Sequence, residues 1–478
     1  MDYNGFLIDS LITHGSDSGH FAPLGHLMSA FVRIASQYST VGVLLALCLG
    51  FSLATIVDQP LSPKDAANQL AGRIAPSDWS RTLIVSTDSS EDVAFAEELR
   101  KLAPNVSDSD SDNRFVRGTP QEIRRAILTR QTTTTAETTT RSPLLLVQSP
   151  DTIAWTLFEN ANEKFPGLSI QFLRPETMRW PNFLKSSNLI NIVNQIVVIA
   201  IIAVGMTLVI LTGGIDLSVG SLIALSSVVC ARGIRDWGGA ENATITTMLL
   251  AGGVSLVLCG LCGLFNGALI VGFSMPPFIA TLGTMLMTSG FAFILSQGQS
   301  IDAVPENFIW LGRGFFLGIP VAVALMLLIY AVAQIVMKYT IYGRTIYAIG
   351  GNSEAAKLCG IRVNRWIVST YVISSLLAGL GGLVMASRLK SGDAKYGGMY
   401  ELYVIAAVVV GGTSLRGGYG SVFGTLIGAL IIAVIENGMN LVHIESYTQK
   451  VVFGAIILLA VLLDRIKHAY SSSGRFDS

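Results

Sequence analysis

Long apolar runs separated by short polar breaks make up most of the chain, and they predict a series of hydrophobic helices. The runs cover approximately residues 40–56, 188–212, 217–231, 245–271, 276–296, 317–337, 366–387, 403–412, 420–441 and 449–464. A helix needs about 20 apolar residues to cross a bilayer, so some of these runs are too short to cross alone. We therefore expect a polytopic α-helical membrane protein with roughly 8–10 hydrophobic segments, some of them broken or re-entrant.

Residues 57–184 depart from this pattern, because roughly half of all charged residues fall within them. Their apolar positions form short strand-like runs, RTLIVSTD, SPLLLVQS and LSIQFL. Between the runs lie the helix-like stretches EDVAFAEELRKL, TPQEIRRAIL and DTIAWTLFENANEKF. Alternation of strand and helix predicts a mostly parallel sheet. We expect a small soluble α/β domain inserted after the first span.

The distribution of Lys and Arg predicts the orientation, because these residues concentrate in cytoplasmic loops. The loop 338–365 and the carboxyl end are basic, and counting crossings from them places residues 57–184 outside. The expected parts are a cytoplasmic segment 1–37, a first transmembrane helix 38–56, the extracytoplasmic insertion 57–184, a transmembrane domain 185–466 and a cytoplasmic tail 467–478. The cations that oppose the rule are Arg232, Arg235, Arg388, Lys390 and Lys395.

Composition supports a membrane protein and argues against other classes. Hydrophobic residues make up 51% of the chain and charged residues 13%, and the mean hydropathy is +0.56. Such values are typical of proteins surrounded by membrane lipids. Lys+Arg and Asp+Glu both total 32, so there is no basic excess to bind nucleic acid. Cys259 and Cys262 form a C-x-x-C, a spacing that can serve a redox or metal site, but they lie inside an apolar run with no partner His or Cys nearby in sequence, so no metal or other cofactor is expected.

Two apolar segments are interrupted by paired glycines. The first is GGIDLSVGSLIAL at 213–225, and the second is GGTSLRGGYGSVFGTLIGAL at 411–430. Paired glycine-interrupted segments in the two halves of a membrane protein indicate a transport site near the midplane. The alternative is that the glycines only let helices pack closely.

Asp216 lies within the first break and has two possible roles. An ionisable residue at membrane depth usually marks a transport pathway or a paired structural charge. Asp216 and Ser218 also stand at the start of the following helix, where a carboxylate can cap free N–H groups. The sequence leaves both roles open.

At these residues the chain resembles the membrane permeases of ABC importers for simple sugars of the ribose, xylose and galactose type. The matching stretches are NFLKSSNLINIVNQ (182–195), AVGMTLVILTGGIDLSVGS (203–221), NGALIVGFSMPPFIATLGTM (266–285), YGRTIYAIGGNSEAAKLCGI (342–361), YELYVIAAVVVGGTSLRGGYGSVFGT (400–425) and ENGMNL (436–441). The resemblance covers about 182–466 and the first span. It does not cover the insertion, and Tyr403 stands where many relatives have Asp.

The resemblance implies a transport subunit of the bacterial inner membrane rather than an enzyme. Its partners would be cytoplasmic ABC ATPase subunits, a periplasmic sugar-binding protein and a second permease chain, identical or paralogous. The chain contains no G-x-x-x-x-G-K-[ST] loop, so ATP hydrolysis is expected on a separate chain. The family's cytoplasmic loop docks into the ATPase, and here it would contain Gly343, Arg344, Gly350, Asn352, Ala355, Ala356 and Gly360. Asn352 is also a good N-cap for a short helix SEAAKLCGI, closed by Gly360.

The sequence thus predicts a permease that carries a monosaccharide inward, with polar groups and backbone surrounding the pathway. The expected pathway residues are Gly213, Gly214, Asp216, Ser218, Asn266, Thr281, Glu401, Gly411, Gly412 and Thr413. Two alternatives remain open. One is an ion-coupled secondary transporter in which Asp216 carries the proton, and the other is a membrane sensor that uses the insertion as a ligand-binding module.

Overall fold

The computed structural model describes residues 39–473 except 104–113, 135–142, 154, 167 and 303. The predictions made for residues 1–37 and for 474–478 lie outside the described residues. The chain divides into two compact units. One contains the first described helix and the chain from Phe183 onward, and the other is Ile56–Asn182.

Every apolar run identified in the sequence forms a helix. These helices are α3 (Ser39–Ala54), α8 (Ser186–Leu211), α9 (Val219–Gly238), α10 (Ile245–Gly272), α11 (Pro277–Ser296), α13 (Val321–Tyr339), α16 (Val363–Leu389), α17 (Tyr400–Val410), α18 (Val422–Leu441) and α19 (Ser446–Ser473). Within the described chain, α8, α10, α11, α13, α16 and α18 are long and apolar enough to cross a membrane. The prediction of a polytopic α-helical membrane protein is confirmed.

Some predicted helix ends are wrong. The sequence predicts that the run 217–231 ends near 231, whereas α9 continues to Gly238. The extra turns are polar, and Asp236 forms ion pairs there with Arg232 and Arg235. Charged pairs on neighbouring turns allow a helix to extend beyond its apolar part.

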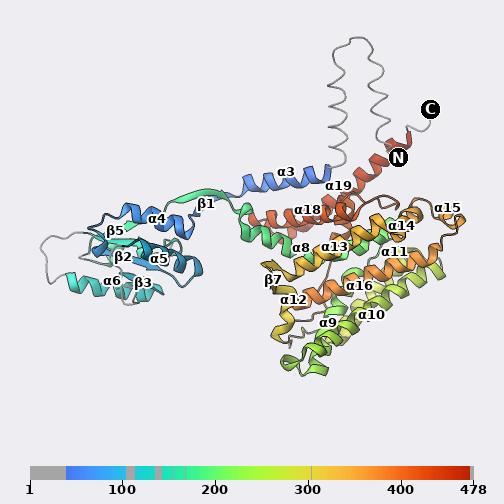
Figure 1. Cartoon of the computed structure of the whole chain (residues 1–478), viewed down its shortest axis with the longest axis horizontal. Helices are drawn as coiled ribbons and strands as arrows, with labels where there is room; N and C mark the ends of the chain where they lie inside the picture. The colour runs from blue at the N-terminus through green and yellow to red at the C-terminus, as the bar shows by residue number, and fades with distance from the viewer. Residues whose placement is uncertain are drawn as a thin grey trace, which may run out of the picture. The chain divides into compact units, whose positions relative to one another are not determined.

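Helix α8 is the interior helix of this unit. In the most apolar 18-residue stretch of α8, 83% of the residues are buried. In the corresponding stretch of α11 only 28% are buried. Helix α8 packs against α13, α16, α17 and α18 (Figure 1). Close contacts at glycines hold α10 against α16: a side chain at Gly263 would meet Ser375, and one at Gly267 would meet Val368. Small residues let helix backbones approach, which is how membrane helices gain packing energy.

Short elements lie at the two ends of α13 (Figure 1). Before α13 come α12 (Trp310–Arg313) and a small hairpin of β7 (Phe315–Phe316) and β8 (Ile319–Pro320). After α13 come α14 (Ile341–Gly351) and α15 (Ser353–Leu358). Helix α15 is the short helix predicted from SEAAKLCGI, and the Asn352 side chain accepts the Ala355 N–H as its cap. Helix α14 was not predicted.

The unit Ile56–Asn182 is a small α/β domain. Its sheet has the order β3-β2-β4-β5, and every neighbouring pair is parallel as predicted. The strands are β2 (Thr82–Ser86), β3 (Phe115–Arg117), β4 (Leu144–Gln148) and β5 (Ile170–Leu173). A separate antiparallel ribbon of β1 (Ile56–Pro60) and β6 (Thr177–Pro181) joins the two ends of the unit.

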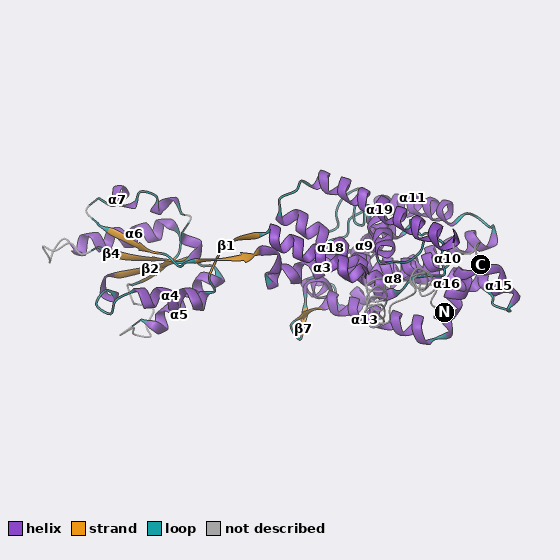
Figure 2. Ribbon diagram, turned by 90° about the horizontal axis from the view of Figure 1, so that it is seen from above, coloured by secondary structure: helices purple, strands orange, loops and turns teal. Residues whose placement is uncertain are grey.

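Helices cover both faces of this sheet (Figure 2). Ile84 faces a cluster with α4 (Pro63–Arg73) and α5 (Ser90–Leu102). Leu83 and Val85 face the opposite cluster with α6 (Pro120–Thr134) and α7 (Ala161–Lys164). Successive residues of a strand point to opposite faces, so a continuous apolar strand is buried on both sides.

One element of this unit was predicted wrongly. The stretch DTIAWTLFENANEKF was expected to be one helix, but it forms two 3₁₀ turns, Pro150–Thr152 and Thr156–Phe158, followed by the four-residue α7. Asn160 has a left-handed conformation with φ 51°. A right-handed helix cannot continue through that conformation, and the apolar pattern of the sequence does not reveal it.

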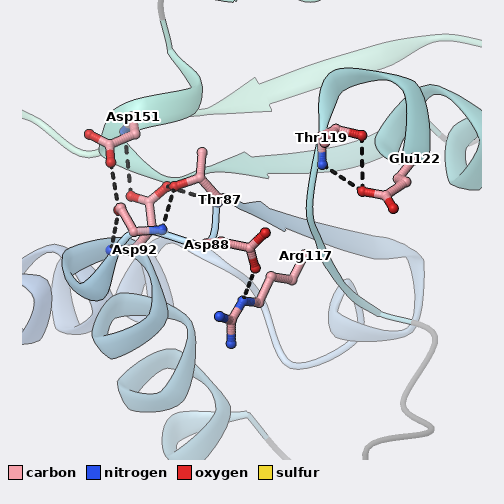
Figure 3. A network of polar contacts seen from close by, with 8 residues as sticks. Thr87, Asp88, Asp92, Arg117, Thr119, Glu122 and Asp151 are labelled. Carbon is pink, nitrogen blue, oxygen red and sulfur yellow. Dashed lines mark hydrogen bonds and ion pairs between the residues drawn. The ribbon is translucent and has the colours of Figure 1, made fainter. Parts of the chain in front are cut away.

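The loops that follow β2 and β4 are tied together by a buried acid, Asp92 (Figure 3). Its carboxylate accepts hydrogen bonds from the Thr87 N–H at 2.9 Å, the Thr87 hydroxyl at 2.8 Å and the Ser149 hydroxyl at 2.5 Å. The Asp151 N–H lies 3.4 Å from its other oxygen. In the sheet, β2 lies between β3 and β4. The chain passes from β2 to β3 on one side of β2 and then crosses to β4 on the other side. Asp92 therefore lies at the carboxyl edge of the sheet, between the ends of β2 and β4, where the strand order reverses.

Candidate functional site

The first glycine break lies immediately after α8. The helix ends at Leu211, Gly213 has φ +82°, and the Gly214 N–H returns to the Val209 carbonyl at 3.0 Å. The chain then runs back alongside α8 until α9 begins. The position of Ser374 on α16 demonstrates this return, because Ser374 touches Gly205 of α8 and also binds Asp216. Gly205 lies six residues before the end of α8, or about 9 Å along its axis. Asp216 thus lies beside the last turns of α8 and not beyond its end.

Asp216 is fully buried and accepts three hydrogen bonds. One carboxylate oxygen accepts the Ser218 N–H at 3.0 Å and the Ser218 hydroxyl at 2.6 Å. The other accepts the Ser374 hydroxyl at 3.0 Å. The carboxylate forms no ion pair with a described residue. It stands at the start of α9, where the free N–H groups and the helix dipole favour negative charge. These bonds hold Asp216 at the start of α9, and its role in a transport pathway stays a prediction.

A chain of buried hydrogen bonds continues from this break into α10 and α11. The Asn266 side-chain amide donates to the Ser218 hydroxyl at 3.1 Å, and the Thr284 hydroxyl donates to the Asn266 Oδ1 at 2.5 Å. The Thr281 hydroxyl lies 3.3 Å from the Ile215 carbonyl and 2.9 Å from the Pro277 carbonyl. The predicted residues Asp216, Ser218, Asn266 and Thr281 are therefore brought together. Together with Ser374 of α16, the network joins the first glycine break to α10 and α11.

The second glycine break begins with a tight turn at the end of α17 and leads to α18. Gly412 has φ +90°, and the Thr413 N–H bonds to the Val408 carbonyl at 3.1 Å. Gly411 packs against the backbone of Gly424, so a side chain at either position would overlap the other segment. The Thr413 hydroxyl is buried and has no hydrogen-bond partner among the described residues. This break is a backbone-packed hairpin that does not share the side chains around Asp216.

The two breaks meet each other and α14 at one junction, which we call the coupling junction: Leu211, Gly418 and Gly350. The Gly418 N–H donates to the Leu211 carbonyl at 2.9 Å. Gly350 of α14 lies so close that an added side chain would overlap both the Leu211 carbonyl and the Gly418 nitrogen. In addition, the Tyr347 hydroxyl donates to the Gly420 carbonyl at 2.8 Å. A displacement of α14 must therefore move both breaks or separate these contacts.

The remaining predicted residues occupy separate positions. Glu401 lies in the first turn of α17, next to Gly220 of α9, and it makes no hydrogen bond to the Asp216 network. Gly343 packs against the Met337 backbone, and Arg344 is exposed. Ala356 is buried, and Gly360 has φ +81° where it closes α15. Among the described residues, no group of three or more His, Cys, Asp or Glu side chains could hold a metal ion.

Sequence reasoning missed Ser374 and Tyr347. Ser374 is 158 residues from Asp216, and Tyr347 is 73 residues from Gly420. The sequence contains only a weak signal for Ser374: with Ser375 it forms one of two polar pairs in the run of α16, the other being Ser369 and Thr370. Nothing in the local pattern shows which way such a pair faces.

Membrane-crossing helices, two glycine breaks and a buried polar network between helices together define a polytopic permease. The family whose model matches residues 188–461 is described as the permease component of the branched-chain amino acid transport system, and the chain belongs to this family. The match begins after the unit Ile56–Asn182.

Individual relatives are sugar permeases. The ribose import permease protein RbsC of Bacillus subtilis (strain 168) is 45% identical over 299 residues, which are 60% of this chain and 88% of the relative. RbsC of Escherichia coli (strain K12) is 44% identical over 291 residues, with the same coverage of 60% and 88%. The L-arabinose ABC transporter permease protein AraH of Azospirillum brasilense is 37% identical over 288 residues, covering 60% and 82%. No solved structure matches the chain.

These matches confirm the resemblance to ABC sugar permeases. The chain is a transport component and not an enzyme, and it is a multi-pass protein of the bacterial inner membrane. Membership of this family implies ATPase and substrate-binding partners.

Proposed function

We propose that the chain is the permease subunit of an ATP-driven importer that carries a monosaccharide of the ribose, xylose and galactose class into the cell. Two of its relatives are named as a ribose import permease and an L-arabinose ABC transporter permease, and both sugars carry several hydroxyls and no charge. Neutral hydroxyl, amide and backbone groups suit such a substrate, because each can donate or accept a hydrogen bond. The pathway is proposed to be shaped by Gly213, Gly214, Asp216, Ser218, Asn266, Thr281, Glu401, Gly411, Gly412 and Thr413.

The coupling junction is the observation that carries this proposal. Helix α14 belongs to the basic segment after α13, which the positive-inside rule places in the cytoplasm, where ATPase partners bind. Gly350 of the same helix touches Leu211, which ends α8 just before the first glycine break, and Gly418 within the second break. Movement of α14 by an ATPase is thereby transmitted through backbone contacts to the end of α8 and to the α17–α18 connection.

The partners follow from this assignment: two cytoplasmic ATPase subunits, a periplasmic sugar-binding protein and a second permease chain. The unit Ile56–Asn182 is proposed to lie on the periplasmic side. Support comes from connectivity, because α8 ends at the coupling junction and so begins, directly after this unit, at the opposite membrane surface. The unit would then be available to dock the sugar-binding protein.

Sugar transport can be tested in proteoliposomes that contain the full chain and its partners, with ribose as the first substrate. The ATPase and binding protein can be sought in the neighbouring reading frames. Uptake should require ATP hydrolysis and should continue after the proton gradient is dissipated. Uptake without an ATPase that stops with the gradient would instead identify an ion-coupled transporter, and ligand binding without uptake would identify a sensor.

The coupling role can be tested with two neighbouring glycines of α14. Gly350→Ala places a methyl group against Leu211 and Gly418, whereas a side chain at Gly351 meets no atom within 4 Å. We expect Gly350→Ala to reduce uptake at least tenfold while ATP hydrolysis continues, and Gly351→Ala to leave both near normal. Equal uptake by the two variants would contradict the role of the junction.

A further inference from the structure

An apolar cavity of about 400 Å³ lies between α8, α13, α14 and α16. Its walls include Val204 and Leu208 of α8, Val332, Val336 and Met337 of α13, and Ile373 of α16. The volume far exceeds the ~30 Å³ share of one water molecule, yet the lining offers almost no hydrogen-bonding surface. Water needs two to four polar partners in a buried site, and a sugar needs more. The cavity therefore suits neither water nor the transported substrate.

The cavity opens toward the surface of the helix bundle. Its floor is buried, because Val204, Leu208 and Met337 are at most 5% exposed. Its rim is exposed, because Leu328 and Val332 are 61% and 51% exposed. Since α13 crosses the membrane, this rim faces the hydrocarbon interior, where the surrounding medium is lipid acyl chains. An acyl chain that enters gains dispersion contacts with walls that otherwise lack a partner.

The α14 end of the cavity has the features of a membrane–water interface. Tyr342 of the lining packs edge-on against Trp366, with ring centroids 5.3 Å apart. Lys338 directly follows the lining residue Met337, Arg344 lies in the first turn of α14, and Arg365 lies in the first turn of α16, beside Trp366 in the sequence. These three cations are exposed and form no ion pair with a described residue. Aromatic and basic residues at this level attract lipid headgroups, anionic ones above all.

From these observations we infer that the cavity binds one acyl chain of an anionic phospholipid, with the phosphate held near Lys338, Arg344 and Arg365. The bound chain lies against Leu208, three residues before the Leu211 carbonyl of the coupling junction. It also touches Tyr342, in the first turn of α14. The lipid supports the packing of α8 against α14, independently of which substrate is transported.

Two alanines of α13 provide a matched test. Ala333 lines the cavity, whereas Ala331 is exposed and does not line it. The full chain is expressed in bacterial membranes, purified in mild detergent, and analysed for retained phospholipid by mass spectrometry. We expect Ala333→Phe to lower retained phospholipid at least twofold because the ring fills the cavity, and Ala331→Phe to match the wild type. Ala333→Leu fills less of the cavity and serves where the Phe variant does not fold, with the same expected direction.

The headgroup is tested by lipid exchange. Wild-type protein offered equal phosphatidylglycerol and phosphatidylcholine should retain phosphatidylglycerol preferentially, and the Lys338→Gln, Arg344→Gln, Arg365→Gln variant should lose that preference. Equal retention in the Ala333 and Ala331 variants would overturn the proposal. So would a change of oligomeric state in Ala333→Phe without loss of lipid, because a second permease chain would then cover the cavity.

Discussion

Asp92 and Asp216 place the same chemistry in two different environments. Both are fully buried, and neither forms an ion pair with a described residue. Each instead accepts hydrogen bonds from a backbone N–H and from hydroxyl groups close to the start of a helix. Asp92 joins two loops of a small α/β domain, and Asp216 joins the break after α8 to α16.

The two acids differ in whether water can reach their hydrogen-bond donors once the carboxylate is removed. The loops around Asp92 end in exposed residues, Asp88 and Asp151 among them, so local opening can admit water to the abandoned donors. Asp216 is enclosed by apolar helices, and the membrane offers no water to replace it. The comparison indicates that a buried acid in a permease can be held for its acceptor capacity alone. The cost of losing it depends on the nearest available solvent.

Removal of the Asp216 carboxylate should have the largest effect. Asp216→Ala leaves the Ser218 N–H and the Ser218 and Ser374 hydroxyls without an acceptor, at about 1–3 kcal/mol for each buried unsatisfied group. We expect sugar uptake in vesicles with all partners to fall more than tenfold, together with the amount of folded chain in size-exclusion profiles. Asp216→Asn retains one acceptor oxygen and should be intermediate. Normal uptake by both variants would remove Asp216 from the site.

Asp92→Ala should have a smaller and more local effect. The loss of the bonds to Thr87 and Ser149 should destabilise the unit Ile56–Asn182 by about 2–3 kcal/mol, because water can reach part of the site. Limited proteolysis of the full chain measures this directly. Cleavage within the unit should accelerate while the fragment from Phe183 onward stays intact. Simultaneous loss of both units would show that they are not separate folding units.

The bond between Ser374 and Asp216 can be isolated with its neighbour as the control. Ser374→Ala removes one donor to the carboxylate, for which about 1 kcal/mol is expected. The Ser375 hydroxyl is buried and has no hydrogen-bond partner among the described residues, so Ser375→Ala should be neutral or slightly stabilising. Thermal unfolding of the two purified variants compares these costs. A larger loss of thermal stability in Ser375→Ala than in Ser374→Ala would show that the bond between Ser374 and Asp216 is not the important contact.

The sequence predicted the helices well because a run of apolar residues directly determines a membrane helix. Part of the site could also be predicted from the sequence: Asp216, Ser218 and Asn266 were selected from sequence motifs, and they lie in one hydrogen-bond network. That Gly350 would meet Gly418 could not be predicted, because backbone contacts between distant segments leave no periodic pattern. The helix expected at 151–165 failed for a related reason, since the left-handed Asn160 is set by its surroundings and not by local hydrophobicity.

The smallest effect concerns an exposed carboxylate, Glu122, which provides the contrast to both buried acids. Hydrogen bonds from the Thr119 N–H and then the Thr119 hydroxyl lower the pKa of Glu122 below its ordinary value of 4.5 (Figure 3). A lowered pKa means that this contact stabilises the start of α6 above about pH 4.5, and that the stabilisation is lost as the pH falls through the pKa of the folded state. Thr119→Ala should move that pKa back toward 4.5.

Hydrogen exchange of α6 peptides, corrected for intrinsic rates, measures this change across that pH range. Protection in Thr119→Ala should be lost at a higher pH than in the wild type, whereas the control Thr129→Ala, whose hydroxyl bonds to the Arg125 carbonyl, should keep the wild-type midpoint. An unchanged midpoint in Thr119→Ala would mean that the bond from the Thr119 hydroxyl contributes nothing measurable beyond the bond from the Thr119 N–H, which the variant keeps. A measurable cost of losing a hydroxyl donor to a carboxylate would then be expected only at the buried Asp92 and Asp216, which is the strongest form of the comparison.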